Sequence, residues 1–492
     1  MKADTYILSF DQSTSTTKAL LFDSQASLIA RADIPHRQLI NEKGWVEHDM
    51  DEVLDNVQNV AKLVVSKVKI RAEQIVAVSI SNQRETSVAW DRRTGRCAYP
   101  AIVWQCGRAG DICKALEDKA SLVKERTGLN LSPYFSAAKF SWMLQHVSRV
   151  QELAREKQLV FSTVDSFLIY HLTQEHAVKT EYSNASRTQL LNLHTLTWDE
   201  ELCALFGLDV SFLPTLENSN TCFGHTTLFG LLPQAVPLCG VLGDSQGALF
   251  AQGCLSPGMV KATYGTGSSI MMNVGQQVPA SKDLVTSIAW SLEGKPTFVL
   301  EGNINYAGAT IQWLVEDVKL ITSAKEAGQL ASLARPSPGL YLVPAFSGLG
   351  APYWDNSARA MICGMSRTTG KCELVRAAEE AIAYQISDII FLMKQESGFE
   401  VQTLRVDGGP TNDSFLMQFQ ADIIQSEVRV APLEELSGQG PALLCGLALG
   451  LYGQETIFKT EPKASYLPKL SKEKQQEYYA GWKKAVAKVL AP

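Results

Sequence analysis

The stretch YILSFDQSTSTTKALLF, residues 6–22, decides the fold. Two apolar segments flank the polar turn DQSTSTT at residues 11–17, and a third apolar segment follows before residue 35. This pattern predicts three antiparallel strands joined by short turns. A helical pattern over residues 50–67, an apolar run over 75–80 and a strand over 87–90 come next, so we expect an α/β domain.

The same pattern begins again in SPGMVKATYGTGSSIMMNVG, residues 256–275, after a middle part (105–235) that reads mostly as helices and loops. A long helix over 373–395, a strand ending in LRVDGGP and a helix over 412–425 continue this second half. The repeat predicts two similar lobes. We place the N-terminal lobe at residues 1–250, the C-terminal lobe at 251–455 and a helical tail packed on the lobes at 456–492.

Composition sets limits on function. The chain has 492 residues, 46% of them hydrophobic, and a net charge of −6 without long runs of either sign. These values are typical of a globular protein and give no sign of a nucleic-acid or membrane partner. The ten cysteines form no C-x-x-C pair, and neither a secretory signal nor an apolar run of membrane-spanning length is visible. We therefore expect a cytoplasmic enzyme that acts on a small molecule.

Three turns are candidates for binding phosphate. The first contains Asp11 and a run of hydroxyl residues, the second is Tyr264-Gly265-Thr266-Gly267-Ser268-Ser269, and the third is Asp407-Gly408-Gly409-Pro410 before a helix. Backbone N–H groups, hydroxyls and glycines in such turns suit a phosphate and its metal ion. Each turn taken alone is equally typical of an ordinary hydrogen-bonded hairpin or tight turn. None matches a P-loop or a dinucleotide fingerprint, which argues against a dehydrogenase.

A second group of residues suits a polyhydroxyl acceptor. Arg84 and Glu85 follow an apolar strand, where a buried guanidinium and carboxylate can bind hydroxyls, although a structural ion pair explains them too. Trp104 offers an apolar wall or is simply part of the core. Asp244 follows the apolar strand 238–243 and is a candidate general base, or alternatively a cap of the next helix.

With these segments in order, the chain resembles the FGGY family of carbohydrate kinases, and its glycerol kinases above all, from the first hairpin to about residue 452. The matching segments include ISNQRETSVAWDRRTG (80–95), TEYSNASRTQLLNLHTLTWD (180–199), VPAFSGLGAPYWD (343–355) and LRVDGGPTNDSFLMQFQADI (404–423). The family's first motif is met in full by YFSAAKFSWMLQH, residues 134–146. Its second motif, residues 364–380, has one departure, because Glu379 stands where an apolar residue is usual.

The resemblance implies an actin/hexokinase-like fold of two ribonuclease-H-like lobes with the site in the cleft between them. It also implies ATP-dependent phosphorylation, with Mg²⁺, of a primary hydroxyl of glycerol or a related small polyol or sugar. Arg84 and Asp244 would be catalytic, with Asp244 as the base and Asp11 as a metal ligand. The acceptor-binding set would be Arg84, Glu85, Trp104, Tyr134, Asp244, Ser245 and Ser269. The nucleotide-binding set would be Thr14, Ser15, Thr16, Lys18, Thr266, Gly308, Gln312, Gly409 and Asp413.

Two departures fall in the acceptor pocket. Ser245 stands where Gln is usual, and Ser269 where Phe is usual, so the pocket loses bulk and two contacts. The first alternative is therefore a kinase for a longer, four- or five-carbon polyol or ketose. The second alternative is a nucleotide-driven, actin-like switch protein, which would have no need of the acceptor residues. Relatives that form dimers and tetramers imply a homodimer or homotetramer.

Overall fold

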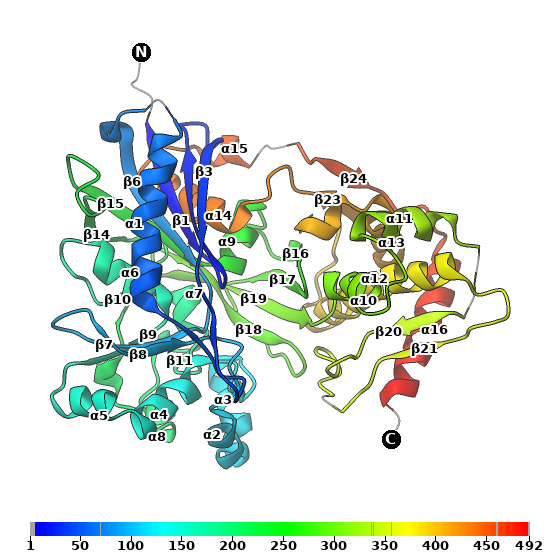
Figure 1. The fold of residues 1–492 in the computed structure, drawn as a ribbon, viewed down its shortest axis with the longest axis horizontal. Coiled ribbons are helices and arrows are strands. Elements are labelled where there is room, and N and C mark those ends of the chain that lie inside the picture. The colour runs from blue at the N-terminus through cyan, green and yellow to red at the C-terminus, as the bar shows by residue number, and fades with distance from the viewer. Residues whose placement is uncertain are drawn as a thin grey trace.

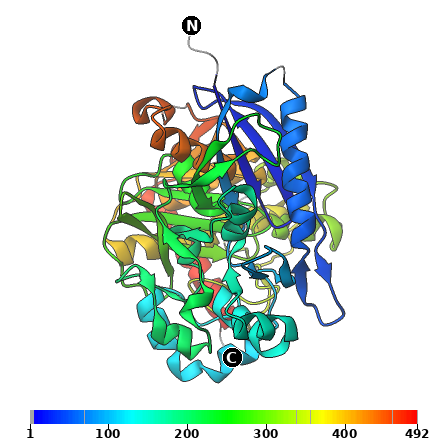
Figure 2. The same cartoon turned by 90° about the vertical axis from the view of Figure 1, so that its left-hand side faces the viewer.

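A computed structural model describes residues 5–490 apart from 69, 336, 338, 356, 459 and 460, and it shows two α/β lobes side by side (Figure 1). The N-terminal lobe lies at the left in blue to green, and most of the C-terminal lobe lies at the right in yellow to red. A turn of 90° brings the N-terminal lobe to the front, with the blue helix α1 alongside the blue strands (Figure 2).

The predicted first hairpin starts the main sheet of the N-terminal lobe. Strands β1, β2 and β3 are antiparallel neighbours, β6 and β15 extend the sheet in parallel beside β1, and β14 closes the edge antiparallel to β15. The sheet order is β14-β15-β6-β1-β2-β3. The bounds are β1 Tyr6–Gln12, β2 Thr16–Phe22, β3 Leu28–Pro35, β6 Ile75–Asn82, β14 Cys222–Thr226 and β15 Val236–Gly243.

The C-terminal lobe repeats this arrangement. Strands β16, β17 and β19 form an antiparallel meander, β22 and β23 add in parallel beside β16, and β24 closes that edge. The order is β18-β19-β17-β16-β22-β23-β24, so β18 is the one addition to the shared pattern. The bounds are β16 Val260–Tyr264, β17 Ser268–Gly275, β18 Val285–Leu292, β19 Lys295–Ile304, β22 Thr403–Asp407, β23 Glu427–Val430 and β24 Ala464–Tyr466.

Helices bury both faces of these sheets. In β1, Leu8 and Phe10 pack in one core with α1, while Ile7 packs on the other face in a core with α14. Helix α12 is the longest, and its apolar residues join those of the C-terminal sheet in a single core. The helices are α1 Met50–Ser66, α2 Gly110–Ala115, α3 Ala120–Thr127, α4 Ser136–His146, α5 Ser148–Arg155, α6 Val164–Leu172, α7 Tyr182–Ala185, α8 Glu200–Leu205, α9 Asp244–Ala251, α10 Gly308–Glu316, α11 Ala324–Leu333, α12 Lys371–Ser397, α13 Ser414–Ile424, α14 Leu436–Ala448, α15 Gln454–Ile457 and α16 Lys472–Leu490.

Residues 39–217 contain more strand than the sequence pattern indicates. A second, five-stranded sheet with the order β4-β5-β8-β7-β9 stands beside the first, and the strand predicted over 87–90 lies there. Its members are short and come from segments far apart in the chain, so local periodicity gives them little signal. The sheet contains β4 Leu39–Ile40, β5 Val46–His48, β7 Ser87–Asp91, β8 Cys97–Ile102 and β9 Leu159–Ser162; three two-stranded ladders are β10 Lys179–Glu181 with β13 Thr215–Glu217, β11 Leu191–Asn192 with β12 Thr197–Trp198, and β20 Tyr341–Val343 with β21 Met361–Cys363.

Helix α14 comes from the C-terminal half of the sequence but packs against β1, β6 and β15 of the N-terminal sheet and against α9. The two helices approach closely, because a Cβ on Gly440 would lie 2.0 Å from the carbonyl oxygen of Gly247. Glycine is therefore required at this crossing. The ten cysteines are free thiols. Within the described ranges, no helix has the length and apolarity needed to cross a membrane.

Candidate active site

Parallel strand ends bring three predicted residues of the N-terminal lobe together. Strand β6 lies between β1 and β15, with Asn82 opposite both Gln12 and Gly243. Asp11 near the end of β1, Arg84 just past β6 and Asp244 just past β15 therefore occupy one edge of the sheet. The carboxyl ends of parallel strands are where α/β proteins bind their ligands.

The first turn places Asp11 beside Lys18. The two residues are paired across β1 and β2, and the Lys18 Nζ lies 3.6 Å from Asp11 Oδ2. Lys18 also donates to Glu435, at 2.8 Å, just before α14. No local sequence pattern points to Glu435, because its partner Lys18 lies 417 residues away in the chain. Lys18 is thus held between two carboxylates in the structure.

Asp11 has the chemistry expected of a metal ligand. Its Oδ1 atom is buried and has no hydrogen-bond partner among the residues that the structure describes. Burial raises the pKa of this carboxyl to about 6, against the lowering effect of Lys18. A buried, unpartnered carboxylate oxygen is a fitting ligand for Mg²⁺, which favours one or two carboxylates together with phosphate oxygens.

The other residues of this turn form hydrogen bonds mainly through their backbone groups. The carbonyl of Thr14 accepts from His36 Nε2 at 3.0 Å, and that of Ser15 accepts from the backbone N–H of His36 at 3.0 Å. The backbone N–H of Ser13 donates to Thr16 across the turn. The Thr14 hydroxyl accepts from Trp104 Nε1 at 2.9 Å, so Trp104 is tied to the turn.

Arg84 is held by two acidic residues from different lobes. Its Nε lies 3.2 Å from Asp244 Oδ1, and its two terminal nitrogens donate to the two oxygens of Glu301 at 3.0 and 2.9 Å. Glu301 lies on β19 of the C-terminal lobe. Such a bidentate pair fixes the plane of the guanidinium as well as its position.

Arg187 completes this buried network. It donates to Glu85 through Nε and to Glu301 through Nη1, and these side chains are almost inaccessible to solvent. Burial alone would raise the pKa of Glu301, but Arg187 and Arg84 hold that pKa well below its usual range. Neither Arg187 nor Glu301 was predicted. The one signal was a Glu within the apolar strand sequence FVLEGN, residues 298–303.

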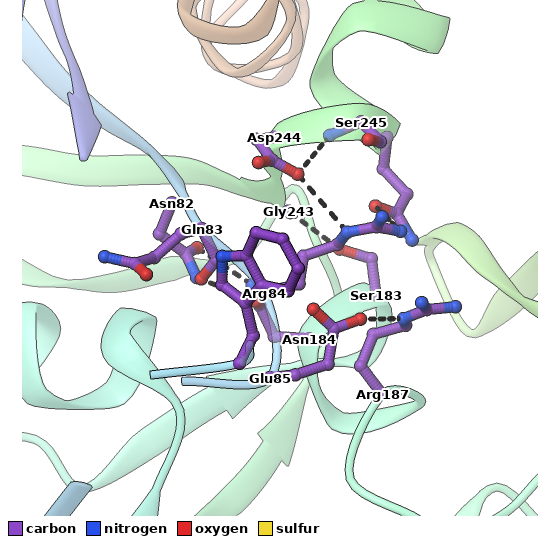
Figure 3. Close-up of polar contacts among 12 residues, drawn as sticks. Asn82, Gln83, Arg84, Glu85, Ser183, Asn184, Arg187, Gly243, Asp244 and Ser245 are labelled. Carbon is purple, nitrogen blue, oxygen red and sulfur yellow. Dashed lines mark hydrogen bonds and ion pairs between the residues drawn. The ribbon is translucent and has the colours of Figure 1, made fainter. Parts of the chain in front are cut away.

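Figure 3 shows how Asp244 is oriented. Asp244 is the first residue of α9, and its Oδ1 accepts both from Arg84 and from the backbone N–H of Ser245, at 2.6 Å. The side chain is 35% exposed, so the carboxylate is fixed at one oxygen while the group remains accessible. The same view shows Glu85 paired with Arg187 on the other side of Arg84.

Aromatic residues stand next to this network. The rings of Trp104 and Tyr134 lie 5.4 Å apart at an angle of 59°. The backbone of Tyr134 is held by the buried Lys139, whose Nζ donates to its carbonyl at 2.6 Å. Burial lowers the pKa of Lys139 to about 7. Glu85 itself has a positive φ of 61°, which is unusual for a residue with a side chain and is found at functional sites.

The two serines that depart from the family lie on different elements. Ser245 is partly exposed on α9, beside Asp244. Ser269 lies on β17 opposite Asn303 of β19, and Asn303 donates to Glu301. The Ser269 hydroxyl is buried, and the described residues offer it no hydrogen-bond partner. Ser245 is thus adjacent in sequence to Asp244, and Ser269 is linked to Glu301 through Asn303. Asp244 and Glu301 are the two residues that hold Arg84.

In the C-terminal lobe, the second and third turns also lie side by side. Strands β16 and β22 are parallel neighbours, with Thr263 opposite Asp407. The backbone N–H of Gly308, at the start of α10, donates to Gly265 at 3.0 Å, which places α10 against the second turn. A Cβ on Gly409 would meet open space, so the backbone there is accessible.

Two more of the predicted nucleotide residues have partners within the protein. Gln312 lies on the exposed side of α10 and donates to Glu316 at 2.9 Å. Asp413 caps α13 by accepting from the backbone of Phe415 and Leu416, and its carboxylate lies directly against Gly328 of α11. The nucleotide-binding roles of this set stay predictions.

Two α/β lobes with the same core strand order, joined by the Arg84–Glu301 ion pair, form a fold of the actin/hexokinase-like class. Residues 6–251 match the N-terminal domain of the FGGY family of carbohydrate kinases, and residues 260–449 match its C-terminal domain. The chain belongs to the FGGY family of carbohydrate kinases.

Individual relatives narrow the comparison. The chain is 43% identical to glycerol kinase 1 of Thermotoga maritima over 490 residues and 41% identical to the glycerol kinase of Bacillus cytotoxicus over 488, covering 98–99% of each chain. Among solved structures, that of Plasmodium falciparum glycerol kinase with ADP has a TM-score of 0.94 at 33% identity over 99% of both chains. A xylulose kinase from Lactobacillus acidophilus has a TM-score of 0.86 at 21% identity over 98% of both chains and shows the shared fold.

Proposed function

We propose that this carbohydrate kinase transfers the γ-phosphoryl group of ATP to a primary hydroxyl of glycerol. The observation that carries the proposal is the Asp244 carboxylate, fixed by Arg84 at one oxygen, partly exposed, and on the same sheet edge as Asp11. The names of the relatives at 41–43% identity support glycerol as the acceptor, and the structure described with ADP supports an adenine nucleotide as the donor.

In this proposal, Asp244 accepts the proton of the attacking hydroxyl. An Asp in this role is the common solution for phosphoryl transfer to alcohols, where catalysis is otherwise positioning and charge neutralisation. Arg84 has its Nε and three of its terminal N–H groups directed at Asp244, Glu301 and Gln246, which leaves one N–H for an acceptor hydroxyl. Glu85 uses Oε1 for Arg187, so its second oxygen can accept from another hydroxyl.

The remaining acceptor contacts come from the aromatic pair and the serines. Trp104 and Tyr134 would form an apolar wall for the carbon chain, while Ser245 and Ser269 leave more space than the usual Gln and Phe. The relatives do not favour the longer-acceptor alternative or the switch-protein alternative. We therefore expect the extra space near the serines to weaken glycerol binding, and not to change which acceptor the enzyme uses.

For the donor, Asp11 would hold Mg²⁺ together with the phosphates, and the bound ion would neutralise charge on the transferring group. Thr14, Ser15 and Thr16 would contact the phosphates from the first turn, with Lys18 adding positive charge. Thr266, Gly308, Gln312, Gly409 and Asp413 would bind the nucleotide from the C-terminal lobe. A cytoplasmic location, a homodimer or homotetramer and the division of the chain near residue 250 stay predictions.

The test is the substitution Asp244→Asn, which keeps the shape of the side chain but removes the base. We expect kcat for glycerol-dependent ADP formation to fall by about 10²–10⁴, as for loss of a general base. ATP binding, measured by calorimetry, should remain near normal. Asp118→Asn, at an exposed surface ion pair, serves as the matched control and should keep wild-type kcat. Near-normal turnover of Asp244→Asn would refute the assignment.

A further inference from the structure

A cavity of about 330 Å³ lies between the lobes, away from the residues assigned above. The N-terminal lobe contributes the β2–β3 turn, at residues 25–28, and the end of α9. The C-terminal lobe contributes Arg405 of β22 and Arg429 of β23. Cavities of about 300–1,000 Å³ at domain interfaces are the usual size and place for small-molecule sites.

Three cations stand in a row on the sheet face next to this cavity. Lys261 of β16 is directly opposite Arg405, and Arg405 is directly opposite Arg429. The alternate residues of β22 and β23, including Val406 and Val430, are buried in the helix-covered core on the other face. Like charges directly opposite each other on neighbouring strands are destabilising unless something neutralises them.

The two outer cations have acidic neighbours. Burial lowers the pKa of Lys261, and Asp407 opposes that effect by raising it. Arg429 lies 2.9 Å from Glu427, and Glu461 adds a weaker attraction. The described residues provide no carboxylate within ion-pair distance of the central Arg405, which lies near the buried thiol of Cys254; burial raises the pKa of that thiol, and Arg405 lowers it. The cation at the centre of the row thus lacks an acidic partner within the described part of the chain.

A second observation points to a missing acceptor. Gln252, at the end of α9, lines the same cavity, and its Nε2 is buried without any hydrogen-bond partner in the part of the chain that the structure describes. A buried amide N–H₂ without an acceptor costs free energy. Arg405, without a carboxylate partner among the described residues, and Gln252, with its unpartnered amide, thus line the same cavity.

The rest of the wall is apolar. Leu28, Leu433, Ile457 and Phe458 line the cavity beside these donors. An oxyanion bonded to Arg405 and Gln252 would satisfy both groups, and an apolar body would replace water against the hydrophobic wall. We propose that this cavity is a binding site for a small organic anion, with its carboxylate or phosphate group on Arg405 and Gln252 and its apolar part against these four side chains.

The test measures binding of phenyl phosphate and benzoate by calorimetry to the full-length protein, with phenol as the uncharged comparison. Saturating magnesium, a non-hydrolysable ATP analogue and glycerol keep the anions out of the proposed active site. We expect one molecule of anion to bind per chain and phenol to bind far more weakly. The tighter of the two anions identifies the head group that the site prefers.

Arg405→Met should weaken anion binding about tenfold or more, because hydrogen bonds to charged groups are stronger than neutral ones. Gln252→Leu removes only the amide and should weaken binding several-fold, which keeps the test decisive if the Arg405 variant does not fold. Arg155→Met, at an exposed arginine of α5, is the matched control and should bind normally. The proposal is overturned if the wild type binds neither anion at millimolar concentration, or if both cavity variants bind with wild-type affinity.

Discussion

Glu301 is a residue of the C-terminal lobe that supports the proposed acceptor site. It is buried, and it binds both Arg84 and Arg187 of the other lobe. Removing one partner of a buried ion pair typically costs about 3–5 kcal/mol, because the remaining charge stays buried without compensation. Glu301 is therefore expected to act as a positioning residue, through Arg84, on acceptor binding and on the orientation of Asp244.

The substitution Glu301→Gln should raise KM for glycerol and lower kcat/KM about tenfold or more, while KM for ATP changes little. The free energy of unfolding in denaturant should fall as well. Glu52→Gln removes the carboxylate of the ion pair with Arg37 at the surface and is the matched control for a lost charge. An equal fall in kcat/KM for ATP and for glycerol would indicate a general structural defect and would contradict a positioning role of Glu301.

The raised pKa of Asp11 predicts that activity depends on pH. Its pKa is raised to about 6, chiefly by burial, so the carboxyl becomes protonated below that pH in the free enzyme. A protonated Asp11 cannot ligate a metal, so kcat/KM for Mg-ATP should decrease as pH falls through about 6. Affinity for metal-free ATP, measured by calorimetry, should not decrease over the same range. A flat kcat/KM profile from pH 7 to pH 5 would contradict a metal-binding role.

At the scale of single residues, the sequence predicts candidate site residues that lie at or just after the end of an apolar strand. The local sequence pattern is enough to predict both the buried strand and the position of the residue at its end. Asp11, Arg84 and Asp244 are of this kind. It does not predict partners that meet only in three dimensions. Arg84 and Glu301 are 217 residues apart, and Lys18 and Glu435 are 417 apart, so neither pair has a local pattern.

Among the elements, the two hairpins and the long helix α12 follow from local periodicity. The helix predicted over 373–395 runs from Lys371 to Ser397, and the predicted first strand extends two residues further, to Gln12. The five-stranded second sheet does not follow from periodicity, since strands such as β4 and β5 are only two or three residues long and are stabilised by pairing with distant segments.

Glu379 of helix α12 departs from the family's second motif, in which an apolar residue is usual at this position. This side chain is 2% exposed, and one of its carboxyl oxygens has no hydrogen-bond partner in the described part of the chain. Burial, and then the nearby Asp413, raise its pKa well above the usual range. Because the folded-state pKa is above the unfolded-state value, the folded protein retains the proton and its relative stability decreases as pH rises from about 4.5.

Glu379→Leu should therefore stabilise the protein by about 1–3 kcal/mol at neutral pH, the cost of an unsatisfied buried polar group. The gain should be larger at pH 8 than at pH 5, and denaturant unfolding at both pH values measures it. Glu380→Leu, at the neighbouring residue that pairs with Arg376, is the control and should not stabilise. A destabilised Glu379→Leu protein would mean that the carboxyl makes a contact essential to the fold.

For the whole molecule, the shared strand order of the two lobes explains why the main sheet of each lobe contains an antiparallel hairpin with a polar turn, at residues 11–17 and 264–269. The acceptor residues come mainly from the N-terminal lobe, the second and third turns come from the C-terminal lobe, and the Arg84–Glu301 pair joins the two. Both FGGY domains are present, and the relatives align along nearly the full chain. The two-lobed kinase is thus the unit that should be assayed.

The central claim is the choice of acceptor, and steady-state kinetics with ATP and magnesium tests it most directly. The comparison is kcat/KM for glycerol against erythritol, threitol, xylitol and the pentuloses, with ADP formation as the readout and phosphorus NMR to identify the phosphorylated product. We predict that glycerol gives the highest kcat/KM by about tenfold or more, the range expected for contacts to one extra or missing carbon. A four- or five-carbon acceptor with a higher kcat/KM than glycerol would contradict the account.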